Sequence, residues 1–274
     1  MRIPVTMCHG IELEGYPPQI PHPLRADRLT ELMKIAHDMG FESISYDDID
    51  AWRNSDTGLP RRPMLIDFDH PVRSLRHEVL EILDRFGFAA NLFIYTRPYD
   101  PTYERPLNQT PMPEHMTWQE IRELVAAGWR IGAHTVTHPN LSDLSISDPS
   151  GDVLRRELDR CNQVIQENLG IVPREFAYTG TSWSTLAEIE VKKRYRFGRL
   201  WIVGSDYTVD GNRIRYADLV RVSGADEDDG GPPFAARYID GKSDPYRLPS
   251  MDLQALINSP DAFRRYLEGA LRDE

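Results

Sequence analysis

The sequence predicts an α/β fold in which strands and helices alternate within one domain, residues 1–274. The first observation is the alternation itself: short apolar runs are followed by segments whose apolar residues recur at helical spacing. The second is the length of 274 residues, which is long for an ordinary domain but normal for a single barrel of strands and helices. The third is that no linker divides the chain. Together they indicate a parallel sheet with crossover helices.

The first half of the chain supplies four predicted strands. They are residues 3–10, 64–71, 89–96 and 129–135. Between them, apolar residues on one helical face predict helices over residues 25–39 and about 75–86, closed by Gly40 and Gly87. Thr117 and Glu120 form a capping box, which predicts the start of a third helix after a Pro-rich insertion over residues 97–113.

The second half continues the alternation. Helices are predicted over about 151–169 and 184–194, and strands over 175–180 and 199–205. Ser259 and Pro260 cap a final amphipathic helix. In sheets and barrels of this class, active sites collect at the carboxyl ends of the strands, so polar residues at those ends are the first candidates for function.

Composition excludes several classes of protein. With 40% hydrophobic and 27% charged residues, the chain is typical of soluble globular proteins. The formal net charge of −11 argues against nucleic-acid binding, because that affinity comes largely from Lys and Arg neutralising phosphates. No stretch approaches the roughly 18 apolar residues of a membrane span, and the first residues lack an apolar signal core. Two distant cysteines make no disulfide framework, so we expect a reduced, cytoplasmic protein.

His134 and His138 stand four residues apart in the stretch GWRIGAHTVTHPNLSDLS. In an extended strand that separation is about 13 Å, too far for one ion to bind both imidazoles at about 2.1 Å each. Residues 135–137 must therefore turn, and Pro139 favours a loop by disfavouring α geometry at His138. By itself, this spacing suits either a metal site or a polar surface loop.

A second polar cluster, in the stretch DFDHP, ends the predicted strand 64–71. Strand alternation puts Asp67 and Asp69 on one face, and His70 follows at the mouth. Charged residues in an otherwise apolar strand are costly unless they have partners. The two carboxylates are therefore either functional groups at the active edge or structural groups that cap the next helix or pair with an Arg.

These stretches together resemble a known family. LIDFDHPVRSLRHEVLEILDRFGFAANLFI, followed later by GWRIGAHTVTHPNLSDLS, is similar to the NodB-like homology domain of polysaccharide deacetylases, carbohydrate esterase family 4. The resemblance covers most of the chain. It implies a distorted (β/α) barrel that holds a divalent ion, commonly zinc, on an Asp and two His, and that hydrolyses N-acetyl groups on sugars.

By position, the resemblance makes Asp69 the general base and makes His134 and His138 metal ligands. Where the family has a second Asp as a metal ligand, this chain has His70, and imidazole is also a good zinc ligand. We therefore expect His70, His134 and His138 to hold a divalent metal, with Zn²⁺ as the first expectation. If His70 points elsewhere, Asp67 or Asp69 completes the ligand shell and the base assignment changes.

The general acid needs a separate assignment, because no histidine follows His138. Members that resemble the poly-N-acetylglucosamine deacetylases place this histidine on the first strand, in a Tyr-His signature. The stretch MCHGI is similar to that signature, with Cys8 in the Tyr position. The resemblance therefore makes His9 the acid, and the alternative is a histidine that is hydrogen-bonded at a strand end.

The stretch REFAYTGTSW resembles the third motif of the family. It has Ala177 where many relatives have an Arg that orients the base, and Arg174 cannot simply take over that role. Tyr178 and Trp183 are the candidates for substrate binding, and the alternative for both is a place among the core aromatics.

The sequence thus predicts a metal-dependent hydrolase of an amide C–N bond that acts on an N-acetylated sugar or a related small amide. One alternative is another amidohydrolase on the same scaffold, acting on a linear or cyclic amide, which an anionic substrate near Arg196 or Arg199 would favour. The other is a non-catalytic carbohydrate-binding protein with a degenerate site, suggested by His70 and Ala177. The expected partner is a small saccharide or amide, not nucleic acid or membrane, and a homo-oligomer is left open.

Overall fold

The computed structural model describes residues 1–14, 23–55, 57–100 and 115–272, and within them a barrel of 7 parallel strands. The barrel closes because β1 (Ile3–Cys8) pairs in parallel with both β3 (Pro63–Asp69) and β12 (Leu248–Asp252). Its other strands are β4 (Asn91–Ile94), β5 (Arg130–Ala133), β6 (Glu175–Ala177) and β8 (Phe197–Ile202). The predicted α/β barrel with outer helices is confirmed.

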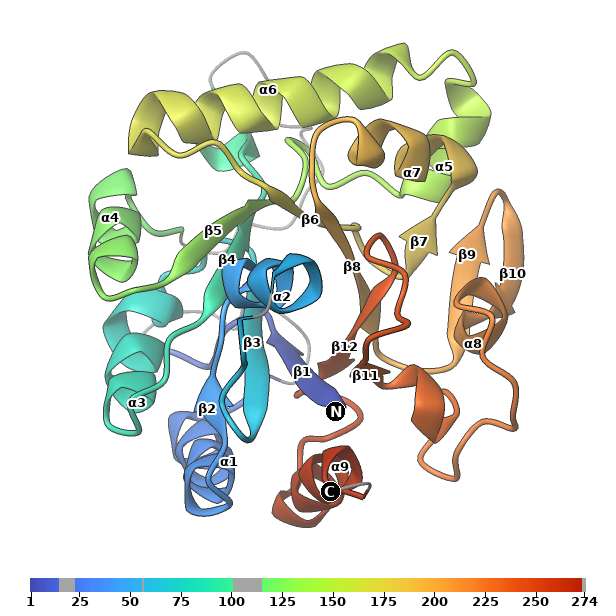
Figure 1. Cartoon of the computed structure of the whole chain (residues 1–274). Helices are drawn as coiled ribbons and strands as arrows, with labels where there is room; N and C mark the ends of the chain where they lie inside the picture. Colours follow the sequence, from blue (N-terminus) through green and yellow to red (C-terminus); the bar gives the residue numbers. More distant parts are fainter. Residues whose placement is uncertain (15–22, 56, 101–114, 273–274) are drawn as a thin grey trace.

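Helices cover the outside of this barrel (Figure 1). They include α1 (Ala26–Asp38), α4 (Trp118–Ala126), α6 (Asp152–Leu169), α7 (Thr185–Lys192) and α9 (Pro260–Ala270). The capping box of Thr117 and Glu120 is present, and the hydroxyl of Ser259 accepts the hydrogen bond that caps α9. The helix expected over about 75–86 is a π-helical segment, η1 (Leu75–Val79), that runs into α3 (Leu80–Asp84).

Several short elements were not predicted, because no apolar periodicity marks them. They are β2 (Glu42–Ser43), α2 (Tyr46–Asn54), η2 (Arg97–Tyr99), α5 (Leu141–Ser147), β7 (Ser182–Trp183), β9 (Asp206–Val209), β10 (Asn212–Arg215), α8 (Tyr216–Leu219), η3 (Phe234–Ala236) and β11 (Tyr238–Ile239). Most of the insertion predicted over 97–113 lies outside the described residues. No helix in the described part of the chain is both long and apolar enough to cross a bilayer.

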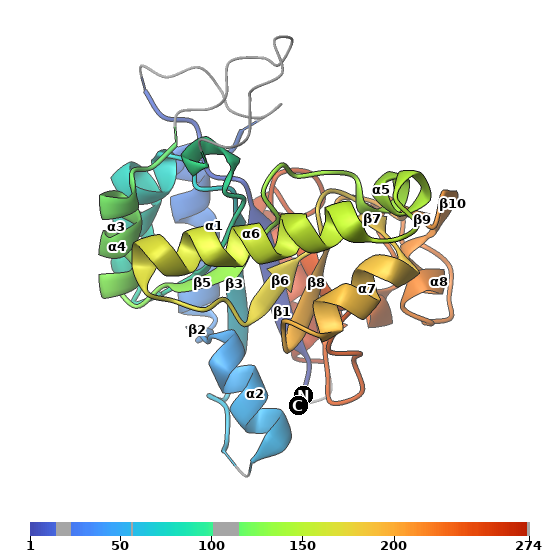
Figure 2. The same cartoon turned by 90° about the horizontal axis from the view of Figure 1, so that it is seen from above.

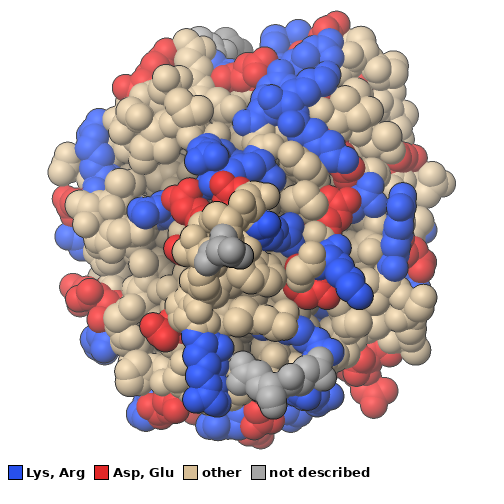
Figure 3. Space-filling model, viewed as in Figure 1, with Lys and Arg blue, Asp and Glu red and all other residues tan. Residues whose placement is uncertain are grey.

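Helix α2 covers the N-terminal end of the barrel. Arg196, which directly precedes β8, donates hydrogen bonds to Asp50 at 2.7 Å and to Asp47 at 2.5 Å on this helix. Figure 2 shows α2 at the end of the barrel where both termini lie. Basic and acidic side chains are interspersed over this face of the molecule (Figure 3). The opposite end, where the parallel strands finish, is the end at which the predicted site residues stand.

Candidate active site

Three histidines converge at the C-terminal ends of two barrel strands. His70 follows β3, His134 follows β5, and His138 stands in the loop after His134. Each offers one ligand nitrogen, and these atoms all lie within 4.8 Å of one another. The structure therefore brings the three predicted metal ligands together.

The nitrogen atoms of this cluster fit a metal ion. Nε2 of His70 and Nε2 of His134 are buried and have no hydrogen-bond partner among the described residues. Nδ1 of His134 lies 2.8 Å from the carbonyl oxygen of Ala177. Because a carbonyl only accepts, Nδ1 carries the proton and Nε2 presents its lone pair to the cluster. Buried polar atoms are costly without partners, so these two nitrogens are suited to bind a ligand.

Burial keeps the three imidazoles neutral. It lowers the pKa of His134 to about 3, against the opposing effect of Asp69, and it lowers the pKa of His138 to about 4. Burial and the neighbouring histidines bring the pKa of His70 well below its usual range. Neutral imidazole is the form that binds a metal. At neutral pH, the three histidines can therefore bind a metal ion without first releasing a proton.

The backbone around these ligands adopts a conformation that L residues rarely take. His70, Thr135 and His138 have φ angles of 70°, 67° and 59°, in the left-handed region. Glu157 of α6 fixes the loop, since its carboxylate accepts hydrogen bonds at 2.8 Å from the backbone N–H groups of residues 136 and 137. Such strain persists only where surrounding contacts impose it, and it clusters at functional sites.

Asp69 is buried beside the histidines. Its Oδ2 lies 3.9 Å from Nε2 of His134, and its Oδ1 accepts a hydrogen bond from Nη2 of Arg199 on β8. Burial alone would raise the pKa of this carboxyl, but Arg199 and His134 hold the pKa of Asp69 below its ordinary value. Asp69 is therefore ionised at neutral pH and can accept a proton.

The third motif has Ala177 where many relatives have an Arg, and in this structure Arg199 contacts Asp69 instead. Its side chain is 0% exposed and lies between two carboxylates, with Nε 3.4 Å from Oδ2 of Asp67 and Nη2 on Asp69. Its guanidinium also lies over the ring of Phe93, 4.7 Å from the centroid. An Arg therefore orients Asp69 in this chain, but it comes from β8. Because the guanidinium of Arg199 is buried against these aspartates, the structure gives no support to an anionic substrate at this residue, the condition that would favour another amidohydrolase.

Asp67 lies deeper in the barrel than Asp69. It accepts hydrogen bonds from the hydroxyl of Tyr46 at 2.7 Å and from Nδ2 of Asn91 at 3.0 Å. Burial raises the pKa of Asp67 to about 7, although Arg199 opposes the shift. Because these contacts occupy its oxygens, Asp67 supports Arg199 from below and does not join the histidine cluster.

His9 reaches the same mouth from the end of β1. Its ring centroid lies 4.8 Å from that of His70 and 5.1 Å from that of Trp201. Nε1 of Trp201 donates to Oδ2 of Asp252 at 2.7 Å, and burial raises the pKa of that carboxyl. Gly10 has a φ of 104°, and a Cβ there would meet Val72 at 2.5 Å, so the turn that places His9 requires glycine.

The two residues predicted to bind substrate lie elsewhere. Tyr178 is fully buried, with its ring 5.3 Å from that of Phe176, and Trp183 is 5% exposed beneath the guanidinium of Arg247. No ring contact among the described residues joins either side chain to the three histidines. Substrate binding by Tyr178 and Trp183 stays a prediction.

Tyr95 and His115 form a wall of the site that sequence reasoning missed. The ring of Tyr95 lies 4.8 Å from that of His70 and 6.2 Å from that of His138. The hydroxyl of Tyr95 lies 2.6 Å from Nε2 of His115. Tyr95 directly follows β4, so its place after a barrel strand was the one available signal.

Comparison with known proteins supports the family resemblance. Residues 56–197, just over half of the chain, match the family model described as Polysaccharide deacetylase. A comparison with curated proteins finds no match.

Solved structures share the fold over nearly the whole chain. The Streptococcus pyogenes deacetylase PplD in complex with acetate has a TM-score of 0.69 at 15% identity, and the match covers 97% of this chain and 98% of that chain. IcaB from Ammonifex degensii has a TM-score of 0.65 at 14% identity, over 97% and 96% of the two chains. The BpsB deacetylase domain from Bordetella bronchiseptica has a TM-score of 0.65 at 16% identity, over 92% and 95%.

Proposed function

Because the chain belongs to the polysaccharide deacetylase family, we propose that it removes the acetyl group of an N-acetylated sugar by metal-dependent hydrolysis. One observation carries the proposal. The buried nitrogens of His70 and His134 lack partners and converge with His138, beside the carboxylate of Asp69 and the ring of His9. PplD and the BpsB domain are both described as deacetylases, and PplD holds acetate, the product that such a reaction releases.

His70, His134 and His138 would hold the metal, with His70 in the position where the family has a second Asp. Zn²⁺ is the ion that we propose, since it accepts three imidazole ligands and leaves room for water or substrate. A divalent ion bound here would polarise the acetyl carbonyl and lower the pKa of a bound water.

The protein's own residues then move two protons. Asp69, held ionised by Arg199, takes a proton from the water that attacks the acetyl carbon. His9 gives a proton to the departing amine nitrogen as the C–N bond breaks. The products are acetate and a free amino sugar, so atoms and protons balance.

The sequence-based arguments for the two alternatives are weakened by the contacts. Arg196 uses its guanidinium nitrogens on Asp47, Asp50 and Glu175, and the side chain of Arg199 is fully buried, so the contacts do not support an anionic amide at either residue. His70 joins the cluster instead of breaking it. The loss of the usual Arg at Ala177 is made good by Arg199. These contacts favour a competent site over a degenerate one.

Metal analysis followed by an acetate-release assay tests the proposal. We expect the purified protein to carry one divalent ion per chain and to release acetate from at least one member of a panel of N-acetyl sugars. Chelation should abolish release, and added Zn²⁺ should restore it. Release from simple N-acetyl amides but from no sugar would contradict the sugar assignment, and a protein that binds no divalent ion would contradict the mechanism.

A further inference from the structure

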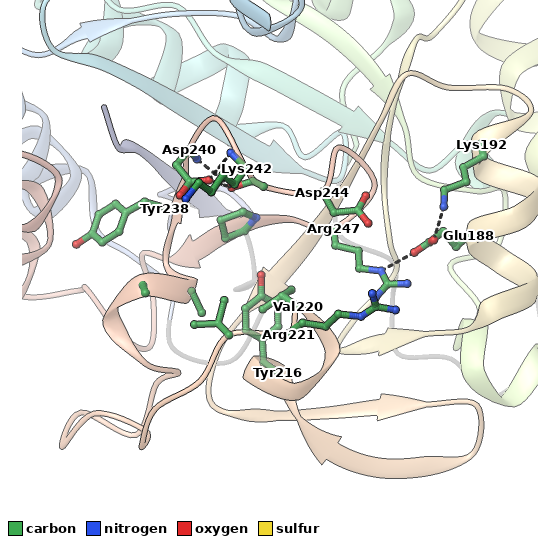
Figure 4. A pocket seen from close by; sticks show the side chains of 15 residues that line it. Glu188, Lys192, Tyr216, Val220, Arg221, Tyr238, Asp240, Lys242, Asp244 and Arg247 are labelled. Carbon is green, nitrogen blue, oxygen red and sulfur yellow. Dashed lines mark hydrogen bonds and ion pairs between the residues drawn. The ribbon is translucent and has the colours of Figure 1, made fainter.

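A cavity of about 690 Å³ lies at the opposite end of the barrel from the histidines, between α7, α8 and the loop that leads into β12 (Figure 4). Its lining includes Arg247 and Pro249, at the start of β12. Arg53 of α2, the helix that covers the N-terminal end, donates to the carbonyl of Asp240 in the same loop at 3.0 Å. A cavity of this size suits a small organic ligand.

The acidic side chains of this cavity already have partners. Glu188 accepts hydrogen bonds from Arg247 at 2.7 Å and from Lys192 at 2.6 Å. Oδ1 of Asp240 accepts from the backbone N–H of residue 242 at 2.8 Å, and Oδ1 of Asp244 accepts from that of residue 246 at 2.9 Å. These carboxylates serve the fold, so they are not offered as partners for a bound cation.

Two cations of the cavity, by contrast, have no partner. The side chains of Arg221 and Lys242 are exposed and make no hydrogen bond or ion pair among the described residues. Arg221 follows Val220, the C-cap residue of α8, and has a left-handed φ of 58°. Figure 4 shows its side chain extended on the side of the cavity where Arg247 also lies.

Arg247 is a fixed cation. Its Nε donates to Glu188, its Nη1 donates to the carbonyl of Leu219 at 2.8 Å, and its guanidinium lies 4.7 Å above the ring of Trp183. Nη2 makes no hydrogen bond among the described residues, so it is free to bind an anion. A guanidinium that is already held in place loses little side-chain entropy when an oxyanion binds.

The remaining lining suits the body of an organic ligand. The apolar part of the wall consists of Val220, Val222, Ala235, Ala236 and Pro249. A ligand that places carbon atoms on this wall would bury them there.

We propose that this cavity binds a small organic phosphate, with its phosphate group on Arg221 and Arg247 and its body against the apolar wall. Guanidinium groups match phosphate oxygens in a bidentate arrangement. Two guanidinium groups on the same side of the cavity (Figure 4) favour a dianion over a singly charged carboxylate. The site lies at the other end of the barrel from the histidines, so it does not rest on the proposed hydrolysis.

Calorimetric titration with phenyl phosphate tests the site, with phenol as the neutral control. We expect saturable binding of phenyl phosphate with a Kd below about 1 mM at low salt, weaker binding at higher ionic strength, and no binding of phenol. Arg221→Ala should weaken binding by about tenfold or more, since one charge-assisted pair is lost. Arg221 makes no contact that folding needs, and a thermal melt verifies that the variant is folded.

Two matched variants complete the test. Arg85→Ala removes an equally exposed Arg beside α3, on the other side of the molecule from α8 in Figure 1, and should bind phenyl phosphate like the unchanged protein. His134→Ala disrupts the proposed metal site and should also bind it unchanged. Equal affinity in Arg221→Ala, loss of binding in His134→Ala, or no saturable binding at all would overturn the proposal.

Discussion

The two ends of the barrel use polar residues in opposite ways. At the N-terminal end, Arg196 meets Asp47, Asp50 and Glu175, so its charge is satisfied within the fold. At the C-terminal end, the buried Nε2 atom of His134 meets no such partner. A buried polar atom that has a partner is explained by the fold, whereas one without a partner calls for a ligand. The difference indicates that the contacts of Arg196 stabilise the fold, whereas the nitrogens around His134 are suited to bind a ligand.

Arg196 and Arg199 show the same contrast three residues apart in one segment. The side chain of Arg196 is 15% exposed at the rim and holds α2 onto the barrel. The side chain of Arg199 is 0% exposed in the interior and holds Asp69. The two residues are of the same type and nearly the same position in the sequence, so only their place in the barrel separates a cation that holds a helix from one that holds the proposed base, Asp69.

The largest effect is expected from the metal ligands. His134→Ala and His138→Ala should each lose most of the bound divalent ion and nearly all acetate release, because a site of three imidazoles cannot hold the ion well with two. Elemental analysis of the purified variants measures the loss. His37→Ala, an exposed histidine on α1, serves as the control and should keep both metal and activity. Full occupancy in both ligand variants would refute the metal site.

The next largest effect is expected from Asp69, the proposed general base. Asp69→Asn should keep the metal and the fold while acetate release falls by about 10²-fold or more, the usual scale for a lost general base. The measurement is kcat together with metal content and a thermal melt. If the metal is lost along with activity, Asp69 is a ligand and not the base.

The effect of replacing His9 on the hydrolysis rate should depend on the leaving group of the substrate. An amine must be protonated to depart, whereas an activated phenolate leaves unaided. His9→Ala should therefore lower hydrolysis of an N-acetyl sugar by about 10²-fold, with the metal retained, and should affect an activated aryl acetate far less. Comparing kcat for the two substrates measures this. Equal losses on both would leave His9 with only a structural part in the barrel mouth.

A moderate difference in kcat is expected between substitutions of Arg199 and Arg196. Lys cannot reproduce the fork with which Arg199 spans Asp67 and Asp69, so Arg199→Lys should lower kcat by about tenfold while KM and metal content change little. Arg196→Lys makes the same change at the other end and should leave kcat unchanged. If the two substitutions have equal effects on kcat, Arg199 is a structural cation like Arg196, and the contrast between the ends fails.

How much of the fold could be predicted from the sequence depends on whether an element is set by a pattern of neighbouring residues or by contacts between distant ones. Six of the seven barrel strands and the long helices were predicted, because apolar periodicity and caps such as Thr117 with Glu120 act over a few residues, but β12 (Leu248–Asp252) was missed. Helix α2 was missed because it is short and polar, with Asp at several positions. Its role at the end of the barrel depends on contacts made by Arg196 at long range.

The candidate site divides in the same way. His70, His134 and His138 belong to short motifs whose spacing alone suggested a cluster, and the structure brings them together. Arg199 and Asp252 belong to no motif that the sequence displays, and they approach the site only because β8 and β12 help to close the barrel. A contact created by closure between distant strands leaves no local pattern to recognise.

The last expected effect is on stability and not on activity, and it concerns Asp67, which links the two ends through Tyr46 of α2 and Arg199 of β8. Burial raises the folded-state pKa of Asp67 to about 7, above the usual value of 3.8 for this carboxyl. Between these two pH values the folded protein binds more protons at Asp67 than the unfolded chain does. The contribution of this group to stability therefore falls as pH rises through that window, by at most about 1.4 kcal/mol per pH unit. Asp67→Asn should remove this dependence of the unfolding free energy on pH, which denaturant unfolding at several pH values between 4.5 and 7.5 would measure.

Asp84→Asn, which changes an exposed carboxyl on α3, controls for the loss of a charge and should keep the slope of unfolding free energy against pH seen in the unchanged protein. Identical slopes in all three proteins would show that Asp67 stays ionised beside Arg199, as Asp69 does, and that both carboxylates on this Arg belong to the charged, catalytic end of the barrel.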